Sequence, residues 1–178
     1  MAPVSIRPFT IDDAAGLREM CLKALLDEPG VFAARYERSV AQTAEFWQSL
    51  AAGDDEHQVF GLFDGDTLIG ITAVFKYDGD ERGETAVFAM SYIEPAHREG
   101  GLSKRLYEAR LEWVAARPAF TTVRVSHRRS NEVSRRANQR FGFTLVNVVE
   151  AEWPDGTVDD ELIYELRVNV PQEKGTRP

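Results

Sequence analysis

The sequence has only one cysteine and no long apolar run. Cys21 has no partner for an intrachain disulfide, and it falls in a helically spaced apolar run, which predicts a small core residue. No apolar stretch approaches the roughly 18 residues that span a bilayer. The N-terminal residues also lack the basic start and apolar segment of a signal peptide. We therefore expect a cytoplasmic protein without a membrane partner.

Positive charge is scarce as well. The 178 residues include 29 Asp and Glu against 21 Lys and Arg, a formal charge of −8. This balance argues against general nucleic-acid binding and weakly favours cationic ligands. No His, Cys or carboxylate cluster has ligand spacing, so no metal is expected. A local basic cluster lacks interleaved aromatic residues and is assigned to cofactor phosphate or to solvation: Arg124, Arg128, Arg129, Arg135, Arg136 and Arg140.

The hydrophobic periodicity predicts one domain over residues 1–170, followed by a frayed tail over 171–178. The element order is β-α-α-β-β-β-α-β-α-β-β, an α/β (α+β) arrangement with a mixed sheet and flanking helices. Strands are expected at 4–7, 58–63, 68–76, 85–93, 121–126 and on both sides of 153–156. Helices are expected at 10–26, 40–52, 102–116 and 131–141.

A glycine-bearing loop connects the strand at 85–93 directly to the next helix. Gly100 and Gly101 permit close approach to the backbone, and the first turn of the helix leaves N–H groups unpaired. Such a turn binds anions, so we expect a phosphorylated cofactor. Neither a G-x-G-x-x-G motif nor a Gly-Lys-Ser/Thr motif is present, which argues against dinucleotide and nucleoside-triphosphate sites. The alternative is a tight turn without a ligand.

Two segments resemble signatures of the GNAT superfamily of acyl-CoA-dependent N-acetyltransferases. Arg98-x-x-Gly101-x-Ser103 is similar to the pyrophosphate loop Arg/Gln-x-x-Gly-x-Gly/Ala, although Ser103 replaces the last small residue. About thirty residues later, an Asn opens a helix that ends in Gly-Phe, from Asn131 to Phe143. The order and the separation also match. Each segment is weak evidence alone, and their joint occurrence supports the resemblance.

The resemblance implies a fold, a cosubstrate and a site. The fold is a mostly antiparallel sheet of about seven strands with about four helices, splayed between strands 4 and 5. The cosubstrate is acetyl-CoA, and Asn131 would contact its pantetheine arm. The implied cofactor-binding residues are Ser91, Tyr92, Ile93, Arg98, Glu99, Gly100, Gly101, Leu102, Ser103, Lys104, Asn131 and Ser134.

The implied reaction is direct attack of a primary amine on acetyl-CoA in a ternary complex. The amine belongs to a small molecule or to a protein N-terminus, and it must lose a proton. Candidate bases or relays are Glu94, Tyr92 and His127, with Glu84 as a further carboxylate. The alternatives are a surface histidine in a basic loop and solvated carboxylates.

Asn138 stands where many relatives carry a tyrosine that protonates the departing thiolate. This departure keeps a second reading open, a non-catalytic CoA-binding sensor or scaffold. Many proteins of this fold form dimers, so a homodimer is a further expectation. Aromatic residues between Glu28 and Gln48 are candidate walls of the acceptor pocket or members of the core: Phe32, Tyr36, Phe46 and Trp47.

Overall fold

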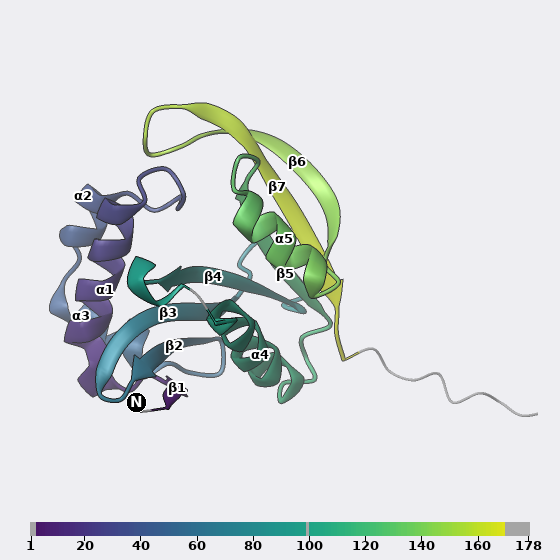
Figure 1. Ribbon diagram of the computed structural model, residues 1–178. Coiled ribbons are helices and arrows are strands. Elements are labelled where there is room, and N and C mark those ends of the chain that lie inside the picture. Colours follow the sequence, from purple (N-terminus) through teal and green to yellow (C-terminus); the bar gives the residue numbers. More distant parts are fainter. Residues whose placement is uncertain (1–2, 99, 170–178) are drawn as a thin grey trace, which may run out of the picture.

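One seven-stranded sheet forms the centre of the protein, in the order β1-β2-β3-β4-β5-β7-β6 (Figure 1). The computed structural model describes residues 3–98 and 100–169, so the predicted tail at 171–178 lies outside it. Neighbouring strands are antiparallel except for the parallel pair β4 and β5, which confirms the predicted mixed sheet. The strands are β1 (Val4–Pro8), β2 (His57–Asp64), β3 (Thr67–Lys76), β4 (Thr85–Ile93), β5 (Thr122–Arg128), β6 (Thr144–Glu152) and β7 (Val158–Arg167).

Helices cover both faces of the sheet. On one face, α1 (Ala14–Asp27) and α3 (Ala44–Ala52) pack their apolar side chains against β2 and β3. On the other face lie α4 (Leu102–Ala115) and α5 (Glu132–Arg140) (Figure 1). Short 3-10 turns precede α1 and α4, namely η1 (Ile11–Asp13) and η2 (Pro95–His97).

Cys21 lies on the side of α1 that faces the core, as predicted. Its side chain is buried, and this burial raises the pKa of the thiol to about 12. Because the thiolate is the reactive form of cysteine, a group with so high a pKa is inert near neutral pH. The structure therefore agrees with a packing role for Cys21.

The predicted helix at 40–52 is wrong at its start. Val40 is instead the last residue of a separate helix, α2 (Tyr36–Val40), and α3 begins at Ala44 after a short break. Thr43 begins the second helix as its N-cap, because its hydroxyl oxygen accepts a hydrogen bond from the Phe46 N–H at 3.2 Å. Gly53, with φ 66°, ends α3 as expected. The chain thus has five α-helices in its described part where four were expected.

The strands β4 and β5 separate after a short paired stretch. Thr85, Ala86 and Val87 pair with residues 122–124, and no further pairs follow between these two strands in the described chain. Along its other edge, β5 pairs with β7 over its whole length, from Thr122 to Arg128. The predicted splay between the fourth and fifth strands is therefore confirmed, and it begins at Phe88.

A β-bulge interrupts β4 just beyond the point of separation. Ile71 of β3 pairs with Tyr92, whereas Ala73 pairs with Ala89, so β4 carries one extra residue in this interval. Met90 lies in that interval with φ 57°, a left-handed conformation that is uncommon for a residue with a side chain. Bulges of this kind redirect backbone groups and are frequent beside active sites.

Strand β6 forms one edge of the sheet and exposes several apolar side chains: Leu145, Val146, Val148 and Val149. The expectation of a homodimer is untested by these observations and stays a prediction.

None of the helices in the described chain combines the length and the apolar character needed to cross a bilayer.

Candidate active site

The loop between β4 and α4 presents an open backbone surface. Gly100 and Gly101 have φ values of 87° and 76°, and an added Cβ would meet no atom within 4 Å at either position. The N-cap of α4 is Gly101, which has no side chain, and no described side chain caps the helix, so its first N–H groups are directed at this open space. The conformation and the space fit a bound phosphate group. Glu99 of the same loop lies outside the described residues.

The Arg98 side chain points away from this loop. Its Nε donates a hydrogen bond to the Ile93 carbonyl at 2.8 Å, and its guanidinium pairs with Glu28 at the end of α1. It also lies 5.6 Å from the Tyr92 ring centre. Arg98 therefore links β4 to α1, and its role toward a pyrophosphate stays a prediction.

The other loop residues predicted to bind cofactor are accessible or half-buried. Ser103 and Lys104 are exposed on the first turn of α4, and Leu102 is half-buried. Lys104 pairs with Glu108 at 3.4 Å on the helix surface. Earlier in β4, the Ser91 hydroxyl lies 2.9 Å from that of Thr72, while Ile93 is buried.

A polar cluster surrounds the end of β4 on the α1 face. The Tyr92 hydroxyl donates to Asp27 at 2.6 Å, and Lys23 donates to the same carboxylate at 2.8 Å. Lys23 also lies 3.6 Å from Glu94, and a His97 ring nitrogen lies 3.9 Å from the same carboxylate. The structure thus brings two predicted residues, Tyr92 and Glu94, to one place.

Hydrogen bonds and burial set the ionisation of this cluster. The bond from Lys23 is the first cause of a lowered pKa at Asp27, and the bond from Tyr92 acts in the same direction. Burial raises the pKa of the Tyr92 phenol, and its bond to Asp27 adds to that effect. Near neutral pH the cluster therefore holds a protonated tyrosine against an ionised carboxylate.

His127 lies on the opposite face of the sheet from Tyr92. It shares its face of β5 with Val123 and Val125, which pack beneath α4, whereas Tyr92 packs with α1. Only 5% of His127 is exposed, so the alternative of a surface histidine is wrong. The three predicted catalytic residues are therefore not gathered into one site.

The hydrogen bonding of His127 fixes its tautomer. Its Nδ1 lies 2.7 Å from the Arg128 carbonyl oxygen, which can only accept, so Nδ1 carries the proton. Burial is the main cause of a lowered pKa, which keeps the ring neutral. Its Nε2 is buried and has no protein partner in the described chain.

Asn131 caps α5. Its side-chain oxygen accepts a hydrogen bond from the Ser134 N–H at 3.1 Å, which is the N-cap role expected from the sequence. Both residues are half-buried and follow directly after β5, beyond its last pair with β4. Their predicted contact with pantetheine is compatible with this place and stays a prediction.

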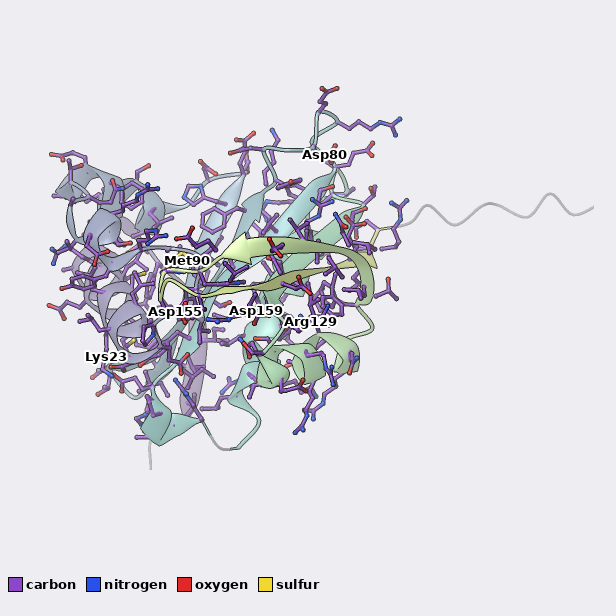
Figure 2. The ribbon with its side chains drawn as sticks, turned by 90° about the horizontal axis from the view of Figure 1, so that it is seen from above. Lys23, Asp80, Met90, Arg129, Asp155 and Asp159 are labelled. Carbon is purple, nitrogen blue, oxygen red and sulfur yellow. The ribbon has the colours of Figure 1, made fainter. Side chains whose placement is uncertain are left out.

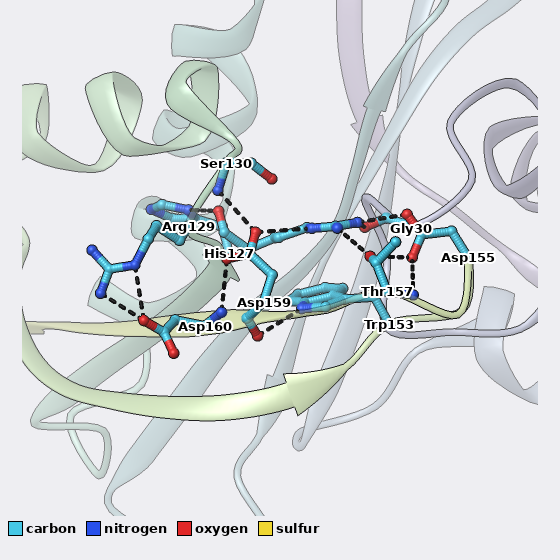
Figure 3. A network of polar contacts seen from close by, with 10 residues as sticks. Gly30, His127, Arg129, Ser130, Trp153, Asp155, Thr157, Asp159 and Asp160 are labelled. Atoms are coloured by element: carbon cyan, nitrogen blue, oxygen red, sulfur yellow. Dashed lines mark hydrogen bonds and ion pairs between the residues drawn. The ribbon is translucent and has the colours of Figure 1, made fainter.

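Arg128 joins three separate parts of the chain, and its partners Gly30, Asp155 and Asp159 are labelled in Figure 3. Its guanidinium donates to Asp155 at 2.7 Å, to Asp159 at 3.0 Å and to the Gly30 carbonyl at 3.1 Å. Asp155 stands at the tip of the β6–β7 hairpin, which extends toward the α1 side of the molecule (Figure 2). The bonds from Thr157 and Arg128 lower the pKa of Asp155 to about 2.

Most other members of the arginine cluster are also paired with carboxylates. Arg129 pairs with Asp160 at 2.7 Å, and Arg124 pairs with Glu165 at the same distance. Arg135 pairs with Glu132 at 3.1 Å. These pairs neutralise much of the local positive charge, which favours the reading of the cluster as a solvated protein surface.

A cavity of about 200 Å³ lies between the α1–α2 segment and the hairpin tip. Two of the predicted aromatic walls line it, Phe32 and Tyr36, together with Glu28, Glu37 and Pro154. The other two do not: Trp47 is buried in the core under α3, and Phe46 is 42% exposed.

Residues 4–144 match a protein-family model described as an acetyltransferase (GNAT) domain. The chain belongs to the GNAT acetyltransferase family. The match covers most of the chain and includes the glycine loop and the first helical turns after the splay. It confirms the resemblance drawn from the two sequence signatures and identifies this chain as an acetyltransferase.

Solved structures of other GNAT proteins share the fold of this acetyltransferase. A GNAT acetyltransferase from Streptococcus pneumoniae has 19% identity and a TM-score of 0.81 over 93% of this chain and 100% of its own. The putative acetyltransferase yncA from Salmonella typhimurium, solved with acetyl-CoA, has 18% identity and a TM-score of 0.74 over 99% and 100%.

A third structure is Arabidopsis thaliana NAA60 in complex with a bisubstrate analogue. It has 16% identity and a TM-score of 0.72 over 94% of this chain and 99% of its own. No curated protein gives a significant match to the sequence. At these identities, the structural likeness establishes the GNAT fold alone.

Sequence reasoning on this GNAT chain missed Asp27 and Lys23. Both lie at the end of α1, where they contact Tyr92 from more than sixty positions away in the sequence. Nothing in the local pattern of α1 distinguishes them from other exposed charges. The Lys–Asp spacing of four residues predicts only a surface ion pair along a helix.

Proposed function

We propose that this acetyltransferase moves an acetyl group from acetyl-CoA to a primary amine by direct attack in a ternary complex. The observation that carries the proposal is the open Gly100–Gly101 backbone at the start of α4, next to strands that separate at Phe88. The loop would hold the pyrophosphate, and the space between the strands would admit the extended arm. Asn131 and Ser134 border that space at the start of α5.

The proposed chemistry uses groups on both sides of the β4 bulge. The amine nitrogen attacks the thioester carbonyl carbon, and a backbone N–H near Met90 stabilises the negative charge that develops on the carbonyl oxygen. The amine proton passes to the Asp27 and Glu94 carboxylates, directly or through water. Tyr92 holds Asp27 in place. The positive charge of Lys23 offsets the repulsion between the two carboxylates.

The proposed acceptor is a small amine that carries positive charge. The cavity near the hairpin combines the aromatic walls Phe32 and Tyr36 with the carboxylate of Glu37, while Glu28, which also lines it, pairs with Arg98. Aromatic faces and carboxylates both attract ammonium groups. The formal charge of −8 supports the same choice. A protein N-terminus is the other amine that this cavity is proposed to accept.

Thermal unfolding with and without acetyl-CoA tests the proposal. A ligand that binds only the native state adds about 2.7 kcal/mol of unfolding free energy at about 100 times its Kd. We expect this stabilisation in the parent protein and its loss in Gly101→Glu, which places a negative side chain where phosphate would bind. Each variant is compared with its own ligand-free Tm, because a non-glycine residue at φ 76° is itself strained.

Gly156→Glu is the matched control. Gly156 also has a positive φ, 78°, and open space around its Cβ position, but it lies in the β6–β7 turn. This variant should keep the full stabilisation by acetyl-CoA. The absence of any shift in the parent protein would overturn the proposal. Stabilisation without release of CoA thiol, across a panel of cationic amines, would instead show a non-catalytic CoA-binding sensor.

Arg128→Met is expected to weaken acceptor binding selectively. The substitution leaves Asp155, Asp159 and the Gly30 carbonyl without their shared donor, so the hairpin tip and the α1–α2 segment lose their link. We expect KM for the amine to rise about tenfold, because an imprecisely held substrate loses orientation. Stabilisation by acetyl-CoA should not change.

Arg129→Met is the control for this experiment. Arg129 is the next residue in the chain and contacts Asp160 on the exposed side of the hairpin. It should leave the amine KM within about twofold of the parent value, as surface ion pairs contribute little. An equal rise of KM in both variants would contradict a specific role for the Arg128 link.

A further inference from the structure

Arg110 is a buried arginine without a carboxylate partner. It projects from α4 toward the sheet, is 1% exposed, and donates from Nε to the Leu106 carbonyl at 3.0 Å. Its Nη2 is buried without a hydrogen-bond partner, and it forms no ion pair with any described residue. Arginines are rarely buried in this way unless an anion or an acceptor compensates them.

The positive charge persists despite burial. Desolvation lowers the pKa of Arg110 to about 10, which still leaves the guanidinium protonated near neutral pH. The guanidinium lies 4.3 Å from the Phe88 ring centre and 4.6 Å from that of Tyr107. Cation–π attraction of this kind offsets part of the cost of burying a charge. The unpaired Nη2 is left for another partner.

Asn138 supplies a second buried donor beside the first. It is fully buried on α5, and its side-chain oxygen accepts a hydrogen bond from the Tyr107 hydroxyl of α4. Its amide Nδ2 has no partner in the described chain. Tyr107 therefore contacts both Arg110 and Asn138. Two buried donors without a partner in the described chain, one of them cationic, thus share Tyr107 as a neighbour between α4 and α5.

These donors lie where β4 and β5 separate. The last pair between the two strands is Val87 with Arg124, and Phe88, beneath the Arg110 guanidinium, is the next residue of β4. Arg110 is eight residues beyond the first residue of α4, a rise of about 12 Å along the helix from the glycine loop. An arm that extends from that loop between the strands would end near this point.

We propose that Arg110 and Asn138 bind the CoA thiolate as it leaves, with Tyr107 as a positioning residue. This inference rests on the proposed acetyl transfer. When the amine attacks, the carbon–sulfur bond breaks and its electron pair stays on sulfur as a thiolate. The guanidinium and the Asn138 N–H stabilise that anion. The proton that the Asp27 and Glu94 carboxylates take from the amine then passes to the sulfur through water, and CoA leaves as the thiol.

The first test compares Arg110→Met with the parent protein in the absence of ligand. If Arg110 is retained for an anion that is formed during the reaction, removal of an uncompensated charge should raise the Tm, by about 2–4 °C. The same variant should lower kcat about 100-fold, as loss of a charge-stabilising donor does elsewhere. A fall in Tm together with an unchanged kcat would overturn the inference.

The second test titrates the thiol of bound CoA through the ultraviolet absorbance of the thiolate. A free thiol has a pKa near 8.5, and a neighbouring cation lowers it by about one unit or more. We expect this lowering in the parent protein and a return toward the free value in Arg110→Met. Arg117→Met is the control, since Arg117 stacks on Trp113 at 3.7 Å outside the region between the helices.

Asn138→Asp keeps the size of the side chain and the acceptor for Tyr107, yet places a carboxylate beside Arg110. We expect the free protein to be more stable, the bound thiol to have a raised pKa, and acetyl-CoA binding by thermal shift to persist. An unchanged thiol pKa in both variants would overturn the inference while acetyl-CoA still stabilises the protein. Absence of that stabilisation in the parent would instead signal failure of the proposed function.

Discussion

We expect Gly70→Ala to destabilise the protein and to lower kcat. An ideal Cβ at Gly70 would lie 2.7 Å from the Tyr92 carbonyl oxygen and 3.3 Å from the Ile93 Cα. Both neighbours are backbone atoms of β4, so the strand itself must move. Overpacking of this kind costs about 1–3 kcal/mol of unfolding free energy.

The loss of activity follows from the direction of that movement. Tyr92 and Ile93 form the end of β4, where Tyr92 contacts Asp27 and the bulge begins. A shift of about 1 Å in groups that orient a reaction can cost about 100-fold in rate. Chemical denaturation and steady-state kinetics with saturating acetyl-CoA measure the two effects.

Gly16→Ala is the matched control for this substitution. Gly16 lies within α1, and its ideal Cβ would make an ordinary contact of 3.7 Å with the Leu68 Cδ2 atom. Alanine in a helix interior is favoured over glycine by about 0.5–1 kcal/mol, so this variant should gain stability. If Gly70→Ala proved as stable as the control, the close approach of β3 and β4 would not govern the position of Tyr92.

The second large effect concerns Met90 in the β4 bulge. With φ 57°, this position costs a non-glycine residue about 1–2 kcal/mol, and a β-branched side chain fits it least well. Met90→Val should therefore either unfold locally or abandon the bulge. Because the bulge directs the N–H that is proposed to stabilise the carbonyl oxygen, we expect kcat to fall about 100-fold.

The variant Met90→Gly distinguishes an effect of the backbone conformation at this position from an effect of the methionine side chain. Glycine adopts the left-handed conformation without strain, so this variant should keep the bulge, retain most of kcat and unfold at or above the denaturant midpoint of Met90→Val. Hydrogen exchange of the β4 amides would report directly on the bulge. Equal activities in the Val and Gly variants would show that the bulge does not position the reacting carbonyl.

The backbone of the glycine loop and the cap of α5 could be predicted from the sequence because they depend on local rules. Two adjacent glycines between a strand and a helix require positive φ angles, and both glycines have them. Asn131 caps its helix as its residue type favours. The order of strands and helices also followed from periodicity, whereas the splay between the fourth and fifth strands was implied by the family resemblance.

The polar cluster at the end of β4 could not be predicted, because it depends on contacts between distant segments. Asp27 acquires its partner Tyr92 only when the end of α1 packs against the end of β4. His127 illustrates a different limit. The fifth strand was predicted to end at residue 126, whereas β5 continues through Arg128 and includes His127. Alternation along a strand also does not reveal which face of a sheet a given residue occupies. The face that His127 occupies follows only from the pairing register of β5 with β7 and from the helices packed on the sheet.

The Arg128 link has a consequence for the acidity range in which the enzyme works. The folded-state pKa of Asp155 is about 2, against about 3.9 for an unperturbed aspartate, and the pKa of Arg128 is raised by the same contact. The stabilising contribution of Asp155 is thus complete above pH 4 and is lost as the pH falls toward 2. Around neutral pH, Asp155 and Arg128 both stay charged, so the ion pair that holds the hairpin does not change. The hairpin link therefore contributes nothing to any change of turnover with pH in that range.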